Sequence, residues 1–162
     1  MGTVEPAPLN IRSVSQLFYD SLALSAWKRT GDASWALRVN PSSGNLHPTE
    51  GYLICGPVNG LTDIPIVTHY AARRHALKVR AEFSLKAWRA LSRGLPEGAI
   101  LVGLSSIHWR EAWKYGERAF RYCQIDAGHA LAAISLAAAG LGWQATLLDD
   151  LRTYLLNKGG WV

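Results

Sequence analysis

Apolar side chains recur at helical spacing near the start of the chain. The stripe comprises Val14, Leu17, Phe18, Leu22, Leu24, Ala26 and Trp27. Positions three and four apart lie on one face of a helix, so this spacing predicts a helix over residues 13–29. Ser13 belongs to a residue type that caps helix N-termini, and we predict it as the N-cap. Gly31 and Asp32 then interrupt the pattern.

Short apolar runs bounded by Gly, Pro or polar residues predict strands farther along the chain. We predict buried strands over 51–56 and 99–104. Residues 66–70 and 76–80 flank a polar turn and predict a hairpin. A helical pattern returns over 83–91. The order of elements is therefore mixed α and β.

A long stretch without proline dominates the second half of the chain. Residues 109–139 predict either one kinked helix or two consecutive helices, ended by Gly140 and Gly142. The most apolar part, residues 130–141, is shorter than the ~20 residues that span a bilayer. We therefore expect a buried helix of a soluble protein, with no membrane association.

The last predicted elements, the chain length and the composition complete the predicted fold. Residues 144–148 predict a strand, and residues 151–156 predict a final helical turn. A length of 162 residues supports one domain, residues 1–162. The hydrophobic fraction of 49% and charged fraction of 18% exclude a largely disordered chain.

Charge and metal-binding residue types exclude some partners. The formal charge is +5, but Lys and Arg are scattered and form no run of five or six, so nucleic-acid binding is not predicted. Cys55 and Cys123 lack C-x-x-C spacing and are predicted as core residues. His69, His75 and His108 stand apart from them, so no metal site is predicted. The first residues do not form an export signal, and we expect a cytoplasmic protein.

Residues 38–48, with the sequence RVNPSSGNLHP, predict a loop of fixed shape. Pro and Gly restrict the backbone around two hydroxyl groups, an amide, an imidazole and a guanidinium group. Such a loop can hydrogen-bond a heteroaromatic ring that carries carbonyl groups and nitrogens. An ordinary Ser/Asn/Gly turn explains the same residues without any ligand.

The segment PSSGNLHP resembles the P-S-S-x-N-x-Q-P loop of the nitroreductase family, with His47 in place of the glutamine. The resemblance implies an FMN cofactor and a homodimer in which this loop of one subunit contacts the flavin held mainly by the other. It also implies an α+β nitroreductase-like fold, a mixed and mainly antiparallel sheet flanked by helices around a long central apolar helix. The implied FMN contacts are Pro41, Ser42, Ser43 and Asn45, with Arg38 as a further contact to the ribityl chain or phosphate.

A second polar cluster lies on the predicted long helix. Lys114 and Arg118 are spaced to share one helix face, and Tyr122, Asp126 and His129 to share another. The basic face is explained equally well as a solvated surface. Asp126 and His129 precede an almost wholly apolar helix, where buried polar groups need partners.

This cluster, KYGERAFRY followed by DAGH and an apolar helix ending in GLG, resembles the branch of the family that oxidises azolines in peptides, the thiazoline oxidases or SagB-type dehydrogenases. The resemblance implies Lys114 and Tyr115 as catalytic residues acting on a small-molecule or peptide substrate. Oxidation of an azoline to an azole removes a proton from carbon and transfers a hydride to flavin, which requires a base. Either Lys114 as a neutral amine or Tyr115 as a phenolate could be that base.

The resemblance weakens towards both ends of the chain. It places Ala145, Thr146 and Leu147 near the flavin, although their pattern departs from that of the family. Family members also carry an arginine-rich element at the start and further elements at the end, so we expect a domain that is incomplete at both ends. An alternative hypothesis is therefore a catalytically silent fragment that serves as a dimerisation or peptide-binding remnant.

Overall fold

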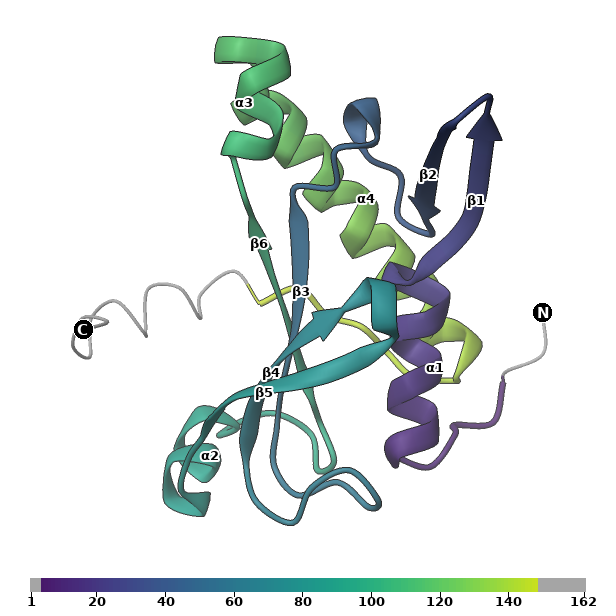
Figure 1. Ribbon diagram of the computed structural model, residues 1–162. Coiled ribbons are helices and arrows are strands. Elements are labelled where there is room, and N and C mark those ends of the chain that lie inside the picture. The colour runs from purple at the N-terminus through teal and green to yellow at the C-terminus, as the bar shows by residue number, and fades with distance from the viewer. Residues whose placement is uncertain (1–3, 149–162) are drawn as a thin grey trace.

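The computed structural model describes residues 4–148 (Figure 1), and its first helix, α1, spans Ile11–Leu22. Asn10 caps this helix, because its side-chain oxygen accepts hydrogen bonds from the amides of Arg12 and Ser13 at 2.8 and 3.1 Å. Ser13 Oγ accepts the Asn10 amide in return at 3.0 Å, which completes a capping box. Ser13 was predicted as the N-cap, and it is instead the reciprocal partner inside the first turn.

The chain forms a β-hairpin where the spacing predicted that the helix would continue to residue 29. Strand β1 (Leu24–Thr30) pairs antiparallel with β2 (Ala33–Arg38), and Gly31 takes a φ of 55° in the turn. The prediction was wrong because, within residues 4–148, no other element covers the apolar side chains that continue the stripe at Ala26 and Trp27. Trp27 remains 59% exposed. Without a buried face, pairing with β2 satisfies the backbone groups instead.

A four-stranded antiparallel sheet forms the centre of the fold. The strands lie in the order β5-β4-β3-β6. They are β3 (Thr49–Cys55), β4 (Ile66–Ala71), β5 (Ala76–Glu82) and β6 (Leu101–Ser106). Together with the short helix α2 (Leu85–Leu91), they confirm the predicted strands, hairpin and helix between residues 51 and 104.

Two consecutive helices follow the sheet. Helix α3 (Trp109–Tyr115) and helix α4 (Ala119–Gly140) are separated by a 3-10 turn, η3 (Gly116–Arg118). Gly116 has a φ of 55° and a ψ of −131°, outside the helical range, and it ends α3. Of the two alternatives predicted for residues 109–139, the consecutive helices are therefore correct. Lys114 and Arg118 lie on different elements and do not share a continuous helix face.

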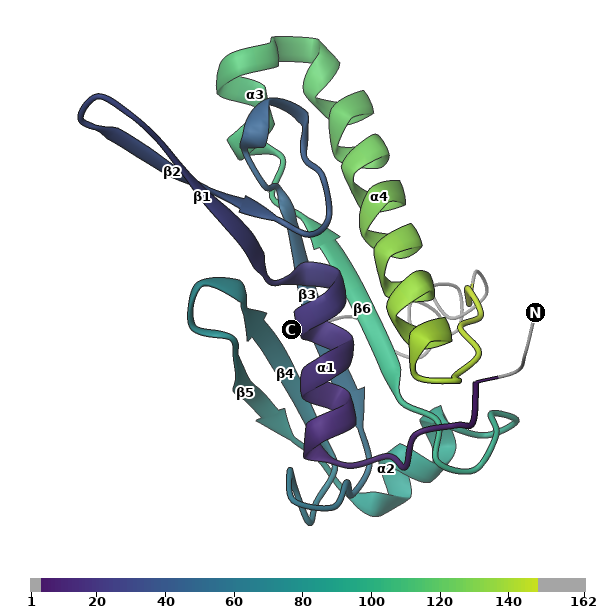
Figure 2. The same ribbon diagram turned by 90° about the vertical axis from the view of Figure 1, so that its right-hand side faces the viewer.

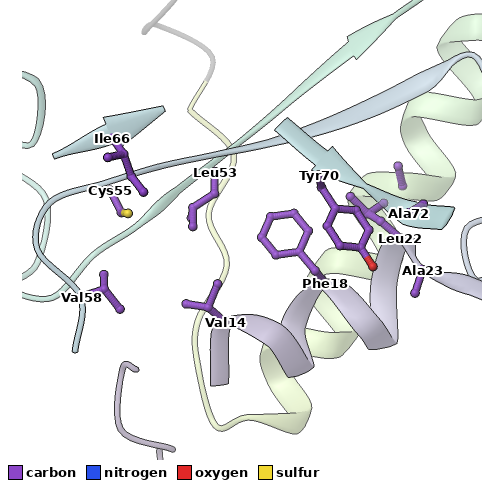
Figure 3. Packing of buried hydrophobic residues seen from close by; sticks show 11 residues of the cluster. Val14, Phe18, Leu22, Ala23, Leu53, Cys55, Val58, Ile66, Tyr70 and Ala72 are labelled. Atoms are coloured by element: carbon purple, nitrogen blue, oxygen red, sulfur yellow. The ribbon is translucent and has the colours of Figure 1, made fainter. Parts of the chain in front are cut away.

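The hydrophobic core lies between the sheet and α1 (Figure 3). Phe18 of α1 packs against Tyr70 of β4 with ring centroids 4.8 Å apart. Leu53 and Cys55 of β3 are fully buried in the same cluster, and Cys123 is fully buried on α4. The prediction that both cysteines are core residues is confirmed.

Helix α4 packs one face on α1 and leaves the other uncovered. Its buried positions include Cys123, Asp126, Ala130 and Ala137, which lie on one stripe, whereas Leu136 is 75% exposed. The prediction of a buried helix over residues 130–141 is therefore correct for only one face of α4 within a single chain. Among residues 4–148, no helix has both the length and the apolarity needed to cross a membrane.

The segment after α4 is extended and irregular. Residues 144–148 form no strand, which corrects the prediction, and their side chains are exposed. A strand needs a hydrogen-bonding partner, and within residues 4–148 this segment pairs with none. The helical turn predicted for residues 151–156 lies outside the described residues.

Candidate functional site

A buried carboxylate on α4 anchors the loop between β2 and β3. Ser42 Oγ donates to Asp126 Oδ2 at 2.7 Å. The Ser43 amide and Ser43 Oγ each donate to Asp126 Oδ1 at 2.9 Å. Asp126 is fully buried, so these loop donors supply the partners that its position on an apolar helix required. The two motifs singled out in the sequence are therefore in direct contact.

Further hydrogen bonds hold the loop from other sides. Asn45 Nδ2 donates to the carbonyl oxygen of Ala36 at 2.9 Å. Arg110 donates to the carbonyl oxygen of His47 at 2.8 Å, and the His47 amide donates to Ser42 Oγ at 2.8 Å. Asn45 and His47 adopt left-handed backbone angles, with φ values of 59° and 50°. Such conformations persist only where the surrounding contacts fix them, so these hydrogen bonds hold the backbone of the loop in place.

Lys114 and Tyr115 lie directly over Gly44 of this loop. A Cβ atom placed on Gly44 would overlap Tyr115 Oη and would lie 2.8 Å from Lys114 Nζ. The ammonium group lies 5.4 Å from the centroid of the Tyr115 ring, and that ring packs on Tyr122 at 4.5 Å. The end of α3 thus places an amine and a phenol together at the tip of the loop, where a side chain on residue 44 would have to displace both.

A second buried carboxyl group, Glu111, lies beside this pair. Its side chain is fully buried, and neither carboxyl oxygen has a hydrogen-bond partner within residues 4–148. Burial and, to a smaller extent, the nearby Asp126 raise the pKa of Glu111, while Lys114 opposes the shift. The sequence did not identify this residue, because a glutamate on a predicted helix usually lies on the exposed face.

His47, the residue that departs from the family glutamine, is enclosed by the loop. Both of its ring nitrogens are buried and have no partner within residues 4–148. Burial lowers the pKa of His47, and the neighbouring positive charge of Arg38 lowers it further. The imidazole is therefore held in its neutral form.

Arg38 lies at the end of β2 and donates to the carbonyl oxygen of Thr49 at 3.0 Å. It borders a cluster that the sequence did not reveal, in which Glu50 accepts hydrogen bonds from His69 and Arg110. Burial acts to raise the pKa of Glu50, but the two hydrogen bonds and the charges of Arg110 and Arg38 outweigh it, and the pKa lies below its usual value. Glu50 is therefore ionised.

Other predicted residues lie away from the loop. His129 is exposed, so the expectation that it needs a buried partner is wrong. The segment Ala145, Thr146 and Leu147 follows the far end of α4, as Figure 2 shows. Gly140 lies 14 positions after Asp126, which corresponds to about 20 Å of helix. The structure therefore does not bring this segment and the loop together within one chain. Pro41 is exposed in the loop.

Comparisons with known proteins agree on one family. Residues 31–158 match the sequence profile of the Nitroreductase family. A protein of Methanocaldococcus jannaschii described as a candidate nitroreductase is 25% identical over 142 residues, which cover 84% of this chain and 66% of that protein. The chain thus spans just under two thirds of this curated relative.

Two solved structures share the fold. A candidate nitroreductase from Anabaena variabilis superposes with a TM-score of 0.67 at 28% identity, over 78% of this chain and 26% of that one. A chain of the E. coli microcin synthetase McbBCD complex with truncated pro-MccB17 bound superposes with a TM-score of 0.69 over 97% of this chain and 64% of that one. At 20% sequence identity, this match shows a shared fold and no more. The predicted nitroreductase-like α+β fold is confirmed.

Proposed function

This chain belongs to the nitroreductase family, and from that premise we propose that it is an FMN-dependent oxidoreductase acting on a small-molecule or peptide substrate. We further propose that it belongs to the SagB-type branch and oxidises azolines to azoles. The observation that carries the proposal is the meeting of Lys114 and Tyr115 with Gly44. These two motifs are about 70 residues apart in the sequence, and the fold brings both to one place.

The groups around the loop fit a flavin. Gly44 has no side chain, and the ends of Lys114 and Tyr115 already occupy the space above its backbone, so a flavin would bind beside them. Ser42 and Ser43 donate their hydroxyl hydrogens to Asp126, so their oxygens can serve a cofactor as acceptors. The Asn45 amide group donates to Ala36, and its carbonyl oxygen can also accept. Pro41, Ser42, Ser43, Asn45 and Arg38 are thus the proposed FMN contacts.

The bound flavin would supply the hydride chemistry, and the chain's own residues would move the proton. Lys114 Nζ and Tyr115 Oη lie at the same point of the loop, so either can reach one substrate carbon. The neighbouring ammonium of Lys114 would stabilise a Tyr115 phenolate, and a neutral Lys114 would itself accept the proton. The packing of Tyr115 on Tyr122 limits the rotation of the phenol and so orients it.

A homodimer with the flavin at its interface is part of the proposal. Helix α4 is apolar nearly all round, and such helices are normally covered on every side. Its outer face presents Ile125, Leu131 and Leu136, exposed by 41%, 40% and 75%. The segment Ala145–Leu147 lies at the opposite end of α4 from the loop. Two copies packed through α4 would allow the loop of one chain to approach this segment of the other.

The proposed chemistry is tested by turnover of an azoline-containing peptide with FMN-loaded protein, in the wild type and in Lys114→Ala and Tyr115→Phe. We expect the base variant to lose about 10²–10⁴-fold in kcat with bound flavin retained. Lys86→Ala on the exposed face of α2 is the matched control and should keep full turnover. Wild-type turnover in both site variants would overturn the assignment of this pair.

The alternative, a silent dimerisation or peptide-binding remnant, is favoured by one observation. The hydroxyl groups of Ser42 and Ser43 are already satisfied inside the chain by Asp126. A loop of this kind is stable without a cofactor. A protein that forms dimers but binds no FMN would support this alternative over the enzyme.

A further inference from the structure

A strongly basic pocket lies on the face of the sheet that is turned away from α1. Tyr52, His69 and Lys78 form one row across β3, β4 and β5, since Tyr52 pairs with His69 and His69 with Lys78. Successive side chains of a strand alternate between faces, so this row points away from the core residues Leu53 and Tyr70. The pocket has a volume of about 490 Å³.

The lining carries six cationic side chains and one carboxylate. The cations are Arg38, Arg73, Arg74, Lys78, Arg80 and Arg110, and the carboxylate is Glu50. The cations come from β2, β5, the turn between β4 and β5, and the start of α3, and Glu50 comes from β3. They line one open pocket with a surplus of five positive charges, and Arg73, Arg74, Lys78 and Arg80 are exposed to solvent.

The single carboxylate cannot balance this charge. Glu50 is 10% exposed at its side chain and is shared between Arg110 and His69. Within residues 4–148, the other five cations have no carboxylate within 4.0 Å. Their mutual repulsion would be relieved by an anion that takes the place of missing acidic partners. Glu50 itself holds Arg110 through a hydrogen bond.

Protection of a sheet edge explains only part of this arrangement. β5 is an edge strand, and Lys78 and Arg80 are the kind of residues that discourage pairing with another chain. Edge protection gives no reason for Arg38 and Arg110, which reach the same cavity from outside the sheet. The approach of Arg38 and Arg110 to the same pocket as the β5 cations therefore needs another explanation.

We propose that this pocket binds a phosphate-bearing anion, for which pyrophosphate is the simplest probe. Guanidinium groups donate in a fork that matches two phosphate oxygens, and the charge of a diphosphate suits several such groups at once. The site shares Arg38 with the proposed FMN contacts, and Arg110 links it to the loop through the carbonyl of His47. The phosphate of FMN and the phosphate of a second ligand share this chemistry.

The test is calorimetric titration of the whole chain with sodium pyrophosphate, against sodium chloride at equal ionic strength. We expect saturable binding that weakens at least about tenfold in the double variant Lys78→Glu, Arg80→Glu. The control double variant, Lys86→Glu with Arg89→Glu, changes the same charges on the exposed face of α2 and should bind as the wild type does. Should the first variant misfold by circular dichroism, Arg73→Gln with Arg74→Gln in the exposed turn replaces it, with the same expected loss.

Absent binding in the wild type, or equal weakening in the pocket and control variants, would overturn the proposal. So would binding of a polyglutamate peptide in preference to pyrophosphate. Competition between pyrophosphate and FMN but not riboflavin would support the pocket and assign it to the cofactor phosphate. Pyrophosphate binding without such competition would support a separate ligand. Pyrophosphate binding by a chain that binds no FMN would support the pocket while contradicting the proposed oxidoreductase.

Discussion

Ser43 donates to the carboxylate of Asp126 both from its backbone amide and from its hydroxyl group, at 2.9 Å each. The two residues are 83 positions apart, and their contact joins the loop after β2 to the middle of the dominant helix. Because Asp126 is fully buried, the loop supplies the hydrogen bonds that its carboxylate needs, and the carboxylate in turn holds the loop in place. The candidate site depends on this contact, since Gly44 is the next residue.

Removing the Asp126 carboxylate should loosen the whole loop. We expect Asp126→Ala to lower the free energy of unfolding by about 2–4 kcal/mol, because the Ser42 and Ser43 donors lose their acceptor in a buried place. Asp126→Asn keeps one acceptor oxygen and should cost less. Hydrogen exchange at the Ser43 amide measures the effect locally, and unchanged protection in Asp126→Ala would contradict this role.

Gly44 and Gly31 form a matched pair for testing the contact with Lys114 and Tyr115. Both have positive φ values, 61° and 55°, so alanine costs about 1 kcal/mol of backbone strain at each. Only at Gly44 would the new Cβ overlap other atoms, and Gly31 has open space. We expect Gly44→Ala to displace the Lys114 and Tyr115 side chains and to lower kcat at least tenfold, an estimate of about 1.4 kcal/mol or more in the barrier. Equal turnover in the two alanine variants would show that the contact plays no part.

The buried carboxyl of Glu111 should make stability depend on pH. Its pKa in the folded chain is raised from the ordinary value of 4.5, so the unfolded chain releases this proton first as pH rises. The free energy of unfolding therefore falls as pH rises from the ordinary pKa of the unfolded chain to the raised pKa of the folded chain. Glu111→Gln removes the ionisation, and its melting temperature should exceed that of the wild type near neutral pH and approach it near about pH 4. A difference that does not vary with pH would refute this account.

The uncovered apolar face of α4 predicts a dimer, and a single charged substitution on this face should weaken it. Leu136→Glu should shift the chain from dimer to monomer by light scattering at low micromolar concentration, with an affinity loss of about 2 kcal/mol or more. The monomer should remain folded, because Leu136 is 75% exposed in the single chain. Ile64→Glu, at a side chain 44% exposed in a loop, is the control and should leave the dimer intact. A wild-type chain that is monomeric would remove this part of the proposal.

Local patterns were sufficient for much of the fold and for the two motifs. The strands between residues 49 and 106 and the helices α2 to α4 follow from apolar periodicity and from glycine breaks such as Gly116. The loop with Gly44 and the pair Lys114 and Tyr115 were each visible as sequence motifs. Their contact was not, because it depends on where α3 ends relative to the loop.

The errors and omissions share a physical cause. A helix through residue 29 fits the apolar spacing, but no core surface lies where Trp27 would need to be buried. The strand expected at residues 144–148 failed for lack of a partner strand in the described part of the chain. The basic pocket depends on strand register, which pairs His69 with Lys78, and register cannot be read from charges scattered along the sequence.

We propose above all that this chain binds FMN at the loop that Lys114 and Tyr115 contact. The direct measurement is titration of the purified protein with FMN, followed by flavin absorbance and fluorescence, in the wild type and in Gly44→Ala with Gly31→Ala as control. We expect saturable changes in the flavin spectrum for the wild type and the Gly31 variant, and weakened binding for Gly44→Ala. A wild-type chain that leaves the flavin spectrum and fluorescence unchanged would contradict it.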